Sequence, residues 1–201
     1  MIDVSTCTSC PLHRALPVGC TPVNGHGNLR AKIMIVGEAL GENEATLGEP
    51  FVGMCGKTLK KMLADANIPQ ESYYITNTVK CWPYEKNGNR TKNRPPTDEE
   101  ITACKGWLWK EIQMLDPYVI ITLGKVPTYT LLASQLKKNF KLDSSIGKEY
   151  KVPWCKSIIY PLYHPSYIMQ YGKAKMQHMV TLLQKVHDIY GKVKKERAVS
   201  V

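Results

Sequence analysis

Residues 31–53, AKIMIVGEALGENEATLGEPFVG, join an apolar run to a loop rich in glycine and glutamate. The run AKIMIV is typical of a buried strand, because apolar and β-branched residues follow one another without interruption. The loop at residues 37–53 contains four glycines and four glutamates. Glycine-rich loops after strands commonly bind phosphates, which glutamates would repel. The carboxylates at this strand end therefore indicate a ligand whose central group is not a phosphate.

Two phosphate-binding motifs are disfavoured by their spacing. The stretch GMCGKT at residues 53–58 ends like a P-loop, but that motif requires a glycine at position 51, where this chain has Phe51. The glycines of GEALG, at residues 37–41, do not have the spacing of a dinucleotide-binding loop. We therefore expect neither a nucleotide triphosphate nor a dinucleotide at this loop.

Strand-like and helix-like segments alternate along the chain. Three further apolar runs are expected to be strands, at residues 72–79, 118–123 and 157–162. Segments with helical periodicity lie between and after them, at residues 56–68, 97–115, 125–136 and 165–190, the last with a break near Gly172. Thr97 with Glu100 three residues later forms a capping box that starts the second of these helices. This alternation predicts an α/β fold, a three-layer α/β/α sandwich with a central four-stranded, mostly parallel sheet.

The segments outside this alternation define the expected domain organisation. We expect one domain over residues 1–190, beginning with an irregular, cysteine-containing lead-in at residues 1–30. Residues 85–96, EKNGNRTKNRPP, are interpreted as a polar insertion loop. Residues 191–201 are interpreted as a basic C-terminal tail.

Polar stretches follow all four expected strands. They are GEALGENE, TNTVKC, GK and YHPSY. Because ligands of parallel sheets bind outside the carboxyl ends of the strands, these stretches are expected to meet at one edge. Glu38 can orient water, act as a general base or stabilise a developing cation. Phe51 is either a core plug or a platform for a flat ring. Asn77 is either a turn cap or an amide that reads a pyrimidine edge. His164 is either structural or part of the site.

The composition limits the possible partners and location. The chain has 201 residues and a formal net charge of +10, which indicates a polyanion such as nucleic acid, although a lysine-rich source or a basic C-terminal tail is the alternative. No apolar run approaches the roughly 18 residues that a membrane span requires, and the N-terminus lacks a secretory pattern. We therefore expect a cytoplasmic protein without membrane contact that acts as a monomer.

Seven cysteines in such a chain argue against a disulfide framework. Cys7 and Cys10 form a C-x-x-C pair, and Cys81 and Cys104 flank the polar insertion. Ligation of a metal or an iron–sulfur cluster and burial as free thiols are the two interpretations. Spacing by itself does not choose between zinc and a cluster.

In combination, the leading CTSC, GEALGENEATLGEPFVG, YITNTVKCWP and YHPSY resemble the uracil-DNA glycosylase superfamily, and most closely family 4, the iron–sulfur type. The resemblance spans roughly residues 5 to 185 with the motifs in order. It implies an enzyme that flips uracil out of DNA and hydrolyses its N-glycosidic bond, leaving an abasic site for base excision repair.

The resemblance also implies a role for each matching residue. Glu38 would position or activate the hydrolytic water, and His164 would donate to uracil O2 as the base leaves as an anion. Phe51 would stack under the uracil, Asn77 would read its N3 and O4, and Glu44 would crowd its C5 face. Gly37 and Ala39 are expected beside the base. The implied ligands of a structural 4Fe–4S cluster, with zinc as the alternative, are Cys7, Cys10, Cys81 and Cys104.

The chain departs from the family pattern at a few positions. Leu40 replaces the usual proline of GEAPG, and Ala45 replaces the usual aspartate after Glu44. The interval between Cys81 and Cys104 is longer than in typical members, which makes Cys104 the least certain ligand. Two alternatives therefore stay open: a catalytically weak DNA-binding or replication-associated module, and a glycosylase for other deaminated bases.

Overall fold

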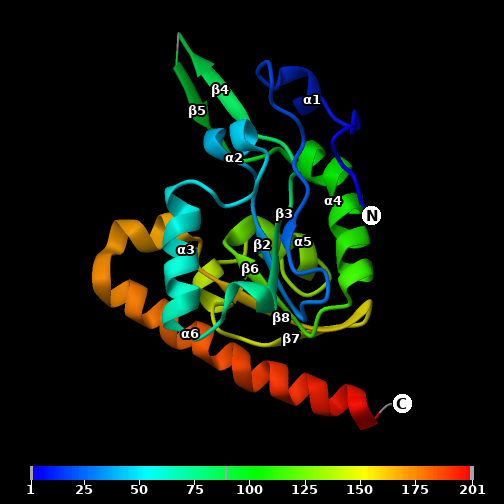
Figure 1. Ribbon diagram of the computed structural model, residues 1–201, viewed down its shortest axis with the longest axis vertical. Helices are drawn as coiled ribbons and strands as arrows, with labels where there is room; N and C mark the ends of the chain where they lie inside the picture. Colours follow the sequence, from blue (N-terminus) through cyan, green and yellow to red (C-terminus); the bar gives the residue numbers. More distant parts are fainter. Residues whose placement is uncertain (1, 89, 200–201) are drawn as a thin grey trace.

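A computed structural model describes residues 2–88 and 90–199, and a six-stranded sheet forms its centre (Figure 1). The strand order is β1-β3-β2-β6-β8-β7. The strands of this sheet are β1 His26–Gly27, β2 Ile33–Gly37, β3 Tyr73–Asn77, β6 Val119–Leu123, β7 Tyr150–Val152 and β8 Cys155–Leu162.

The four central strands are the four that the apolar runs predict. β3, β2, β6 and β8 pair in parallel, so their carboxyl ends meet at one edge of the sheet. The predicted number of strands, four, is too low, because β1 and β7 pair in antiparallel orientation with β3 and β8 at the two edges of the sheet. These edge strands are two and three residues long. Such short segments carry no periodic pattern, and only their pairing with β3 and β8 makes them strands.

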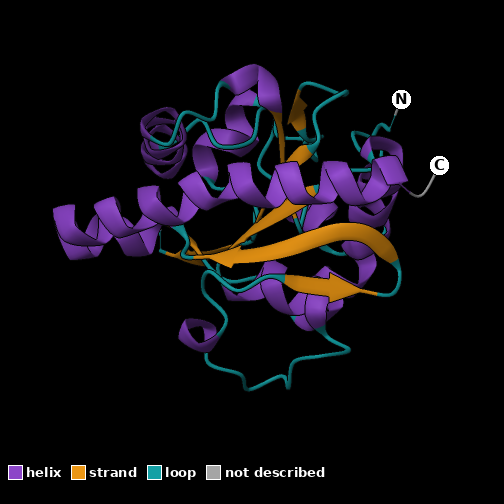
Figure 2. Ribbon diagram, turned by 90° about the horizontal axis from the view of Figure 1, so that it is seen from below, coloured by secondary structure: helices purple, strands orange, loops and turns teal. Residues whose placement is uncertain are grey.

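Helices cover both faces of the sheet, which confirms the three-layer sandwich (Figure 2). On one face α3 and α6 pack on strand residues such as Ile35 and Ile121, and on the other α4 and α5 pack on Met34 and Ile120. Thr97 and Glu100 form the expected capping box at the start of α4. The helices are α1 Leu12–Ala15, α2 Glu42–Leu47, α3 Met54–Asp65, α4 Asp98–Leu115, α5 Lys125–Leu132 and α6 Pro165–Val199, with short 3₁₀ turns at Gln70–Ser72 and Leu142–Ser144.

The last helix both confirms and corrects the sequence prediction. Gly172 has φ 75° and interrupts α6, as the sequence suggests. The boundary expected at residue 190 falls inside the helix, because residues 191–199 form its last turns and Val193 is buried in the core. Arg197 anchors this end through an ion pair of 2.7 Å to Asp116. Residues 200 and 201 of the expected tail lie outside the described residues.

The insertion at residues 85–96 is a β-hairpin rather than a loop. β4 (Tyr84–Asn87) and β5 (Arg90–Asn93) pair in antiparallel register around a turn at Gly88, which has φ 60°. Asn89 of this segment is outside the described residues. Sequence reasoning missed the hairpin because all but one of the described strand residues are exposed, so no apolar alternation marks them.

A buried ion pair fixes the chain just after β3. Lys80 and Glu111 are 1% and 0% exposed, and their Nζ and Oε2 atoms lie 2.5 Å apart. The hydroxyls of Thr76 and Tyr74 also donate to Glu111, at 3.0 and 3.2 Å. Because every charge in this network has a partner, it ties β3 and the chain after it to α4. In the sequence Asn77 lies between Thr76 and Lys80, so this network holds the chain on both sides of Asn77.

None of the helices within the described residues combines the length and hydropathy needed to cross a lipid bilayer.

Candidate active site

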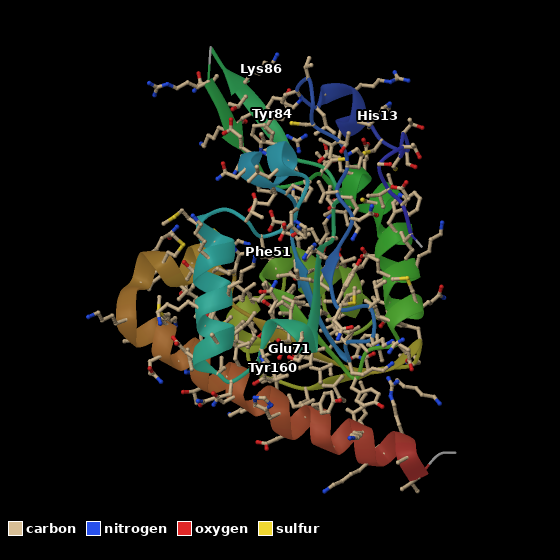
Figure 3. All side chains as sticks on the ribbon, viewed as in Figure 1. His13, Phe51, Glu71, Tyr84, Lys86 and Tyr160 are labelled. Atoms are coloured by element: carbon tan, nitrogen blue, oxygen red, sulfur yellow. The ribbon has the colours of Figure 1, made fainter. Side chains whose placement is uncertain are left out.

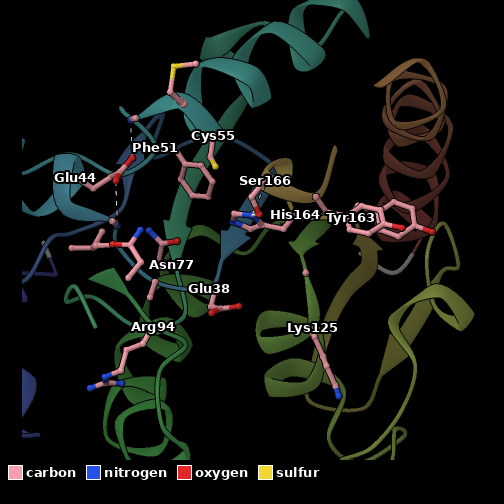
Figure 4. Close-up of a pocket in the computed structure, with 18 of the residues that line it drawn as sticks. Glu38, Glu44, Phe51, Cys55, Asn77, Arg94, Lys125, Tyr163, His164 and Ser166 are labelled. Atoms are coloured by element: carbon pink, nitrogen blue, oxygen red, sulfur yellow. Dashed lines mark hydrogen bonds between the residues drawn. The ribbon is translucent and has the colours of Figure 1, made fainter. Parts of the chain in front are cut away.

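A cavity of about 680 Å³ lies at the carboxyl edge of the sheet and is called the strand-edge cavity below. Glu38, Phe51, Asn77 and His164 surround it, from four different segments of the chain (Figure 4). Ala39 and Glu44 also line it. The convergence of the four polar stretches on one edge is therefore confirmed.

Backbone hydrogen bonds continue the β2–β3 ladder beyond the strands and hold Glu38 beside Asn77. Gly37 is directly opposite Asn77 in the parallel register. The N–H and the hydroxyl of Thr78 both donate to the Gly37 carbonyl at 2.9 Å, and the Val79 N–H donates to the Glu38 carbonyl at 3.0 Å. The strand ends thus place a carboxylate and an amide at fixed positions on the cavity wall.

The Asn77 amide has the properties of a ligand-binding group. Asn77 is 3% exposed, and its side chain makes no hydrogen bond to the residues that the structure describes. The amide atoms are not among the fully buried polar atoms that lack a partner, so they are open to the cavity and available to a bound molecule. Its oxygen accepts and its nitrogen donates, which matches a ring edge with adjacent donor and acceptor atoms.

Gly37 lies beneath this amide and the Phe51 ring. A Cβ atom at Gly37 would lie 2.3 Å from Asn77 Oδ1 and 2.5 Å from Phe51 Cζ. Only glycine therefore allows both side chains their observed positions. The expected place of Gly37 beside the base is consistent with this close packing.

Phe51 has an unusual backbone conformation at the cavity. Its φ is 58°, a left-handed value that bulky side chains rarely adopt. Such strain is typical of functional sites, where the surrounding structure must enforce it. Gly56 permits this conformation of Phe51, because a Cβ atom at Gly56 would lie 1.8 Å from the Phe51 carbonyl oxygen. The ring is 6% exposed and presents a flat apolar wall to the cavity.

Glu44 braces the loop that contains Phe51. Its Oε1 accepts from the Gly53 N–H at 2.8 Å, and its Oε2 accepts from the Gly41 N–H at 3.2 Å (Figure 4). One carboxylate thus links the N-terminus of α2 to that of α3. This bracing contact is not evident from the sequence, because it depends on the fold of the loop.

His164 is held as a neutral imidazole. Its Nδ1 accepts the Ser166 N–H at 3.2 Å and lies 2.8 Å from the Ser166 hydroxyl. A ring nitrogen that accepts an N–H has no proton, so the proton of the neutral ring is on Nε2. Burial lowers the pKa of His164 below its ordinary value of 6.5. The ring is therefore a neutral donor at pH 7, with Nε2–H as its donating group.

Burial acts in the opposite direction on Glu38, and it raises the pKa of this carboxyl above its ordinary value of 4.5. Desolvation disfavours the charged form of any acid, so the shift follows from the position of Glu38 in the wall of the cavity. A carboxylate with a raised pKa is a stronger base than one in water, which suits proton abstraction.

Part of the strand-edge cavity was missed by the sequence reasoning. Ser166 lies in the quoted YHPSY and Lys125 in the quoted GK, so a signal existed for both. No sequence signal marked Leu142 and Asp143, because they belong to the long connection between α5 and β7, which folds back to the sheet edge. The further lining residues include Asn93, Arg94, Lys125, Leu142, Asp143, Tyr163, Ser166 and Tyr167.

Cys7, Cys10, Cys81 and Cys104 line a second, smaller cavity, called the thiol cavity below. Burial first, and then the other three thiols, raise the pKa of Cys81 to about 12. Burial raises the pKa of Cys104 to about 11. Within residues 2–88 and 90–199, no three His, Cys, Asp or Glu side chains are grouped closely enough to hold a metal ion. The four thiols thus share one cavity without forming a closed set of ligands.

Two N–H groups donate to sulfur atoms of the thiol cavity. The Trp107 indole donates to Cys7 Sγ, and the Lys80 backbone N–H donates to Cys104 Sγ, both at 3.2 Å. Hydrogen bonds of this kind stabilise thiolates and tune iron–sulfur clusters. Four thiols and two N–H donors are therefore the chemical groups that a cysteine-ligated site would use, although the described thiols are not grouped as a closed ligand set.

Comparison with known proteins supplies the family context. A family model described as the uracil DNA glycosylase superfamily matches residues 24–187. The chain is 37% identical to the type-4 uracil-DNA glycosylase of Saccharolobus solfataricus over 82% of this chain and 73% of that protein. It is 33% identical to the type-4 enzymes of Archaeoglobus fulgidus, over 94% and 91% of the two chains, and of Thermotoga maritima, over 96% and 92%.

Proposed function

Because the chain belongs to the uracil DNA glycosylase superfamily, we propose that it removes uracil from DNA by hydrolysing the N-glycosidic bond. Relatives of 32–37% identity named type-4 uracil-DNA glycosylases support the same activity. The observation that carries the proposal is the gathering of Glu38, Phe51, Asn77 and His164 around one cavity.

The base-binding part of the proposal follows from the cavity walls. A uracil flipped out of the helix stacks on the Phe51 ring, where it gains contact area that offsets the cost of unstacking. The Asn77 amide accepts from N3–H and donates to O4, which satisfies its unpaired atoms. Gly37 and Ala39 form the backbone beside the base. Glu44 limits the space at C5, and its bonds to the Gly41 and Gly53 N–H groups fix it in place.

The chemical step uses the remaining two residues. The bond between C1′ and N1 breaks with its electron pair moving to uracil, which leaves a cationic sugar and a uracil anion. The His164 Nε2–H donates to O2 and stabilises the anion as it forms. The Glu38 carboxylate stabilises the sugar cation, orients a water molecule towards C1′ and takes its proton. Glu38 then returns its proton to solvent and the uracil anion takes up one proton, so the products are free uracil and an abasic site.

The direct test is an oligonucleotide with a single uracil and a labelled end. After incubation with the enzyme, alkali cleaves any abasic site, so strand breakage at the uracil position reports base release. An identical oligonucleotide with thymine is the control and should stay intact. Binding without breakage would instead favour the DNA-binding module. Breakage at hypoxanthine or thymine as fast as at uracil would favour the broader glycosylase.

The rate of uracil release is expected to fall at acidic pH. Glu38 acts as a carboxylate, so protonation removes its contribution as the pH drops through its pKa. Since burial raises that pKa, the acidic limb of the single-turnover profile should have its midpoint above 4.5. Glu38→Gln should lose this limb and be slow throughout. The same midpoint in that variant would assign the limb to another group, and melting curves at each pH control for unfolding.

We further propose that the thiol cavity holds a structural 4Fe–4S cluster, with zinc as the alternative. When bound, the cluster cross-links the lead-in to the chain around β3 and α4 through its four cysteine ligands. The gathering of these four thiols around one cavity, with N–H donors to Cys7 and Cys104, supports this proposal.

Metal analysis of protein purified without oxygen tests this proposal. We expect about four iron and about four sulfide per chain, and a melting temperature that falls on chelation. Cys104→Ser should lose iron, whereas Cys155→Ser, which alters a cysteine outside the thiol cavity, should retain it. A colourless protein that contains zinc would overturn the cluster in favour of the alternative.

A further inference from the structure

The hairpin β4–β5 lies beside the strand-edge cavity and has no role in the chemistry above. We propose that it is a DNA-binding element, in which Lys86, Arg90 and Lys92 contact phosphates of the strand that holds the uracil. This inference rests on the proposed function, since it assigns a place to the DNA that delivers the flipped nucleotide.

The three cations are available for an external anion. Lys86, Arg90 and Lys92 are exposed, and none has an ion-pair partner among the described residues. Arg94, at the base of the hairpin, is different, because it forms two hydrogen bonds of 2.6 and 2.9 Å with Glu100. Glu85 is the single acidic residue of the sequence between positions 84 and 94. The hairpin therefore has three exposed cations against one acidic residue, and none of the three forms an ion pair among the described residues.

The base of the hairpin is fixed to the rim of the cavity. The Trp82 and Tyr84 rings stack with centroids 4.7 Å apart, and the Trp82 indole N–H donates to Asn93 Oδ1 at 2.7 Å. Tyr84 also donates through its hydroxyl to the Ala15 carbonyl of the lead-in. Asn93 itself lines the strand-edge cavity. A strand that enters the cavity therefore passes the anchored end of the hairpin.

From this base the hairpin projects outward beyond α2, with Lys86 near its far end (Figures 1 and 3). Its register pairs Glu85 with Lys92 and Asn87 with Arg90. Arg90 and Lys92 therefore lie on one face, and Lys86 lies on the other face close to the tip. Strands of four residues extend about 13 Å, and one DNA strand has a phosphate about every 3.4 Å along the helix axis. The hairpin is thus long enough to reach several successive phosphates.

The salt dependence of DNA binding tests the proposal. The test variant is Lys86→Gln/Arg90→Gln/Lys92→Gln. The matched control is Lys156→Gln/Lys194→Gln/Lys195→Gln, which removes the same charge from exposed side chains. Lys156 lies at the amino end of β8. Lys194 and Lys195 lie close in sequence to Arg197, which forms an ion pair with Asp116 just before the amino end of β6. The control thus removes charge near the amino ends of the strands, at the edge of the sheet opposite the strand-edge cavity. The probe is a duplex without uracil, with the dissociation constant measured by fluorescence anisotropy.

Each phosphate contact contributes about 0.9 to the slope of log affinity against log salt on duplex DNA. If all three cations bind phosphates, the hairpin variant should lose about 2.7 from this slope, and the control should keep the wild-type slope. Raising the salt from about 50 mM to about 200 mM should then weaken wild type about 40-fold more than the hairpin variant. Arg90→Lys keeps the charge and should keep the slope.

Two outcomes would overturn the proposal. The hairpin variant could have the slope of wild type, or the control variant could lose as much slope as the hairpin variant, which would mean diffuse binding over the basic surface. If wild type binds DNA but releases no uracil, the proposed function fails, while the slopes still decide the role of the hairpin.

Discussion

His164→Ala is expected to slow single-turnover uracil release about 100- to 1,000-fold, the cost of removing one donor to a developing oxyanion. The imidazole is neutral, with its Nδ1 occupied by the Ser166 N–H, so Nε2–H is the donor that remains for the proposed bond to the leaving base. Alanine removes this donor and leaves a space. A water molecule in that space would be poorly aligned to donate to the base. Since the interaction strengthens as charge develops on uracil, the loss should appear in the rate and much less in DNA affinity.

The measurement is the rate constant of base release with enzyme in excess over a uracil oligonucleotide. Ser166→Ala is the informative companion, because it removes the hydroxyl near Nδ1 but keeps the backbone N–H that sets the tautomer. We expect a loss of less than about tenfold there. If His164→Ala released uracil at the wild-type rate, the donor to O2 would have to be another group, and the site would be misplaced.

Gly37→Ala is expected to lower the same rate about 100-fold, although it adds a single methyl group and no charge. The new Cβ would lie within 2.5 Å of both the Asn77 oxygen and the Phe51 ring tip, so both side chains must move. These are the residues proposed to read and to stack the base. A displacement of about 1 Å in a positioning group can cost about two orders of magnitude in rate.

Gly106→Ala is the matched control for this substitution. A Cβ at Gly106 meets nothing within 4 Å, and alanine favours the helix in which it lies. That variant should release uracil at the wild-type rate. Melting curves separate misplacement from unfolding, since Gly37→Ala should remain folded. Full activity in Gly37→Ala would show that neither Asn77 nor Phe51 needs its observed position.

Much of the site could be predicted from the sequence because the four parallel strands are themselves visible in it. Each central strand is a continuous apolar run, and each ends in polar residues. Once the strands are parallel, geometry brings those ends to one edge, so Glu38, Asn77 and His164 had to approach one another. Glu38, Asn77 and His164 each lie within a few positions of such a strand end, whereas Glu44 and Phe51 lie further along the loop after β2.

The parts that the sequence did not reveal depend on contacts between distant segments. The edge strands β1 and β7 are too short for a pattern, and the exposed hairpin has no apolar alternation. Leu142 and Asp143 reach the cavity only because a long connection folds back onto the sheet edge. The last turns of α6 look like a basic tail until Val193 and Arg197 are seen to pack on the domain.

The sequence by itself determined the layered α/β fold and the chemical groups at the carboxyl edge, since both follow from local hydrophobic runs and from the residues that end them. Only the tertiary structure decided the tautomer of His164, the brace formed by Glu44 and the place of the hairpin beside the cavity. Each of these depends on hydrogen bonds, burial and packing that exist only after the loops have folded against the sheet.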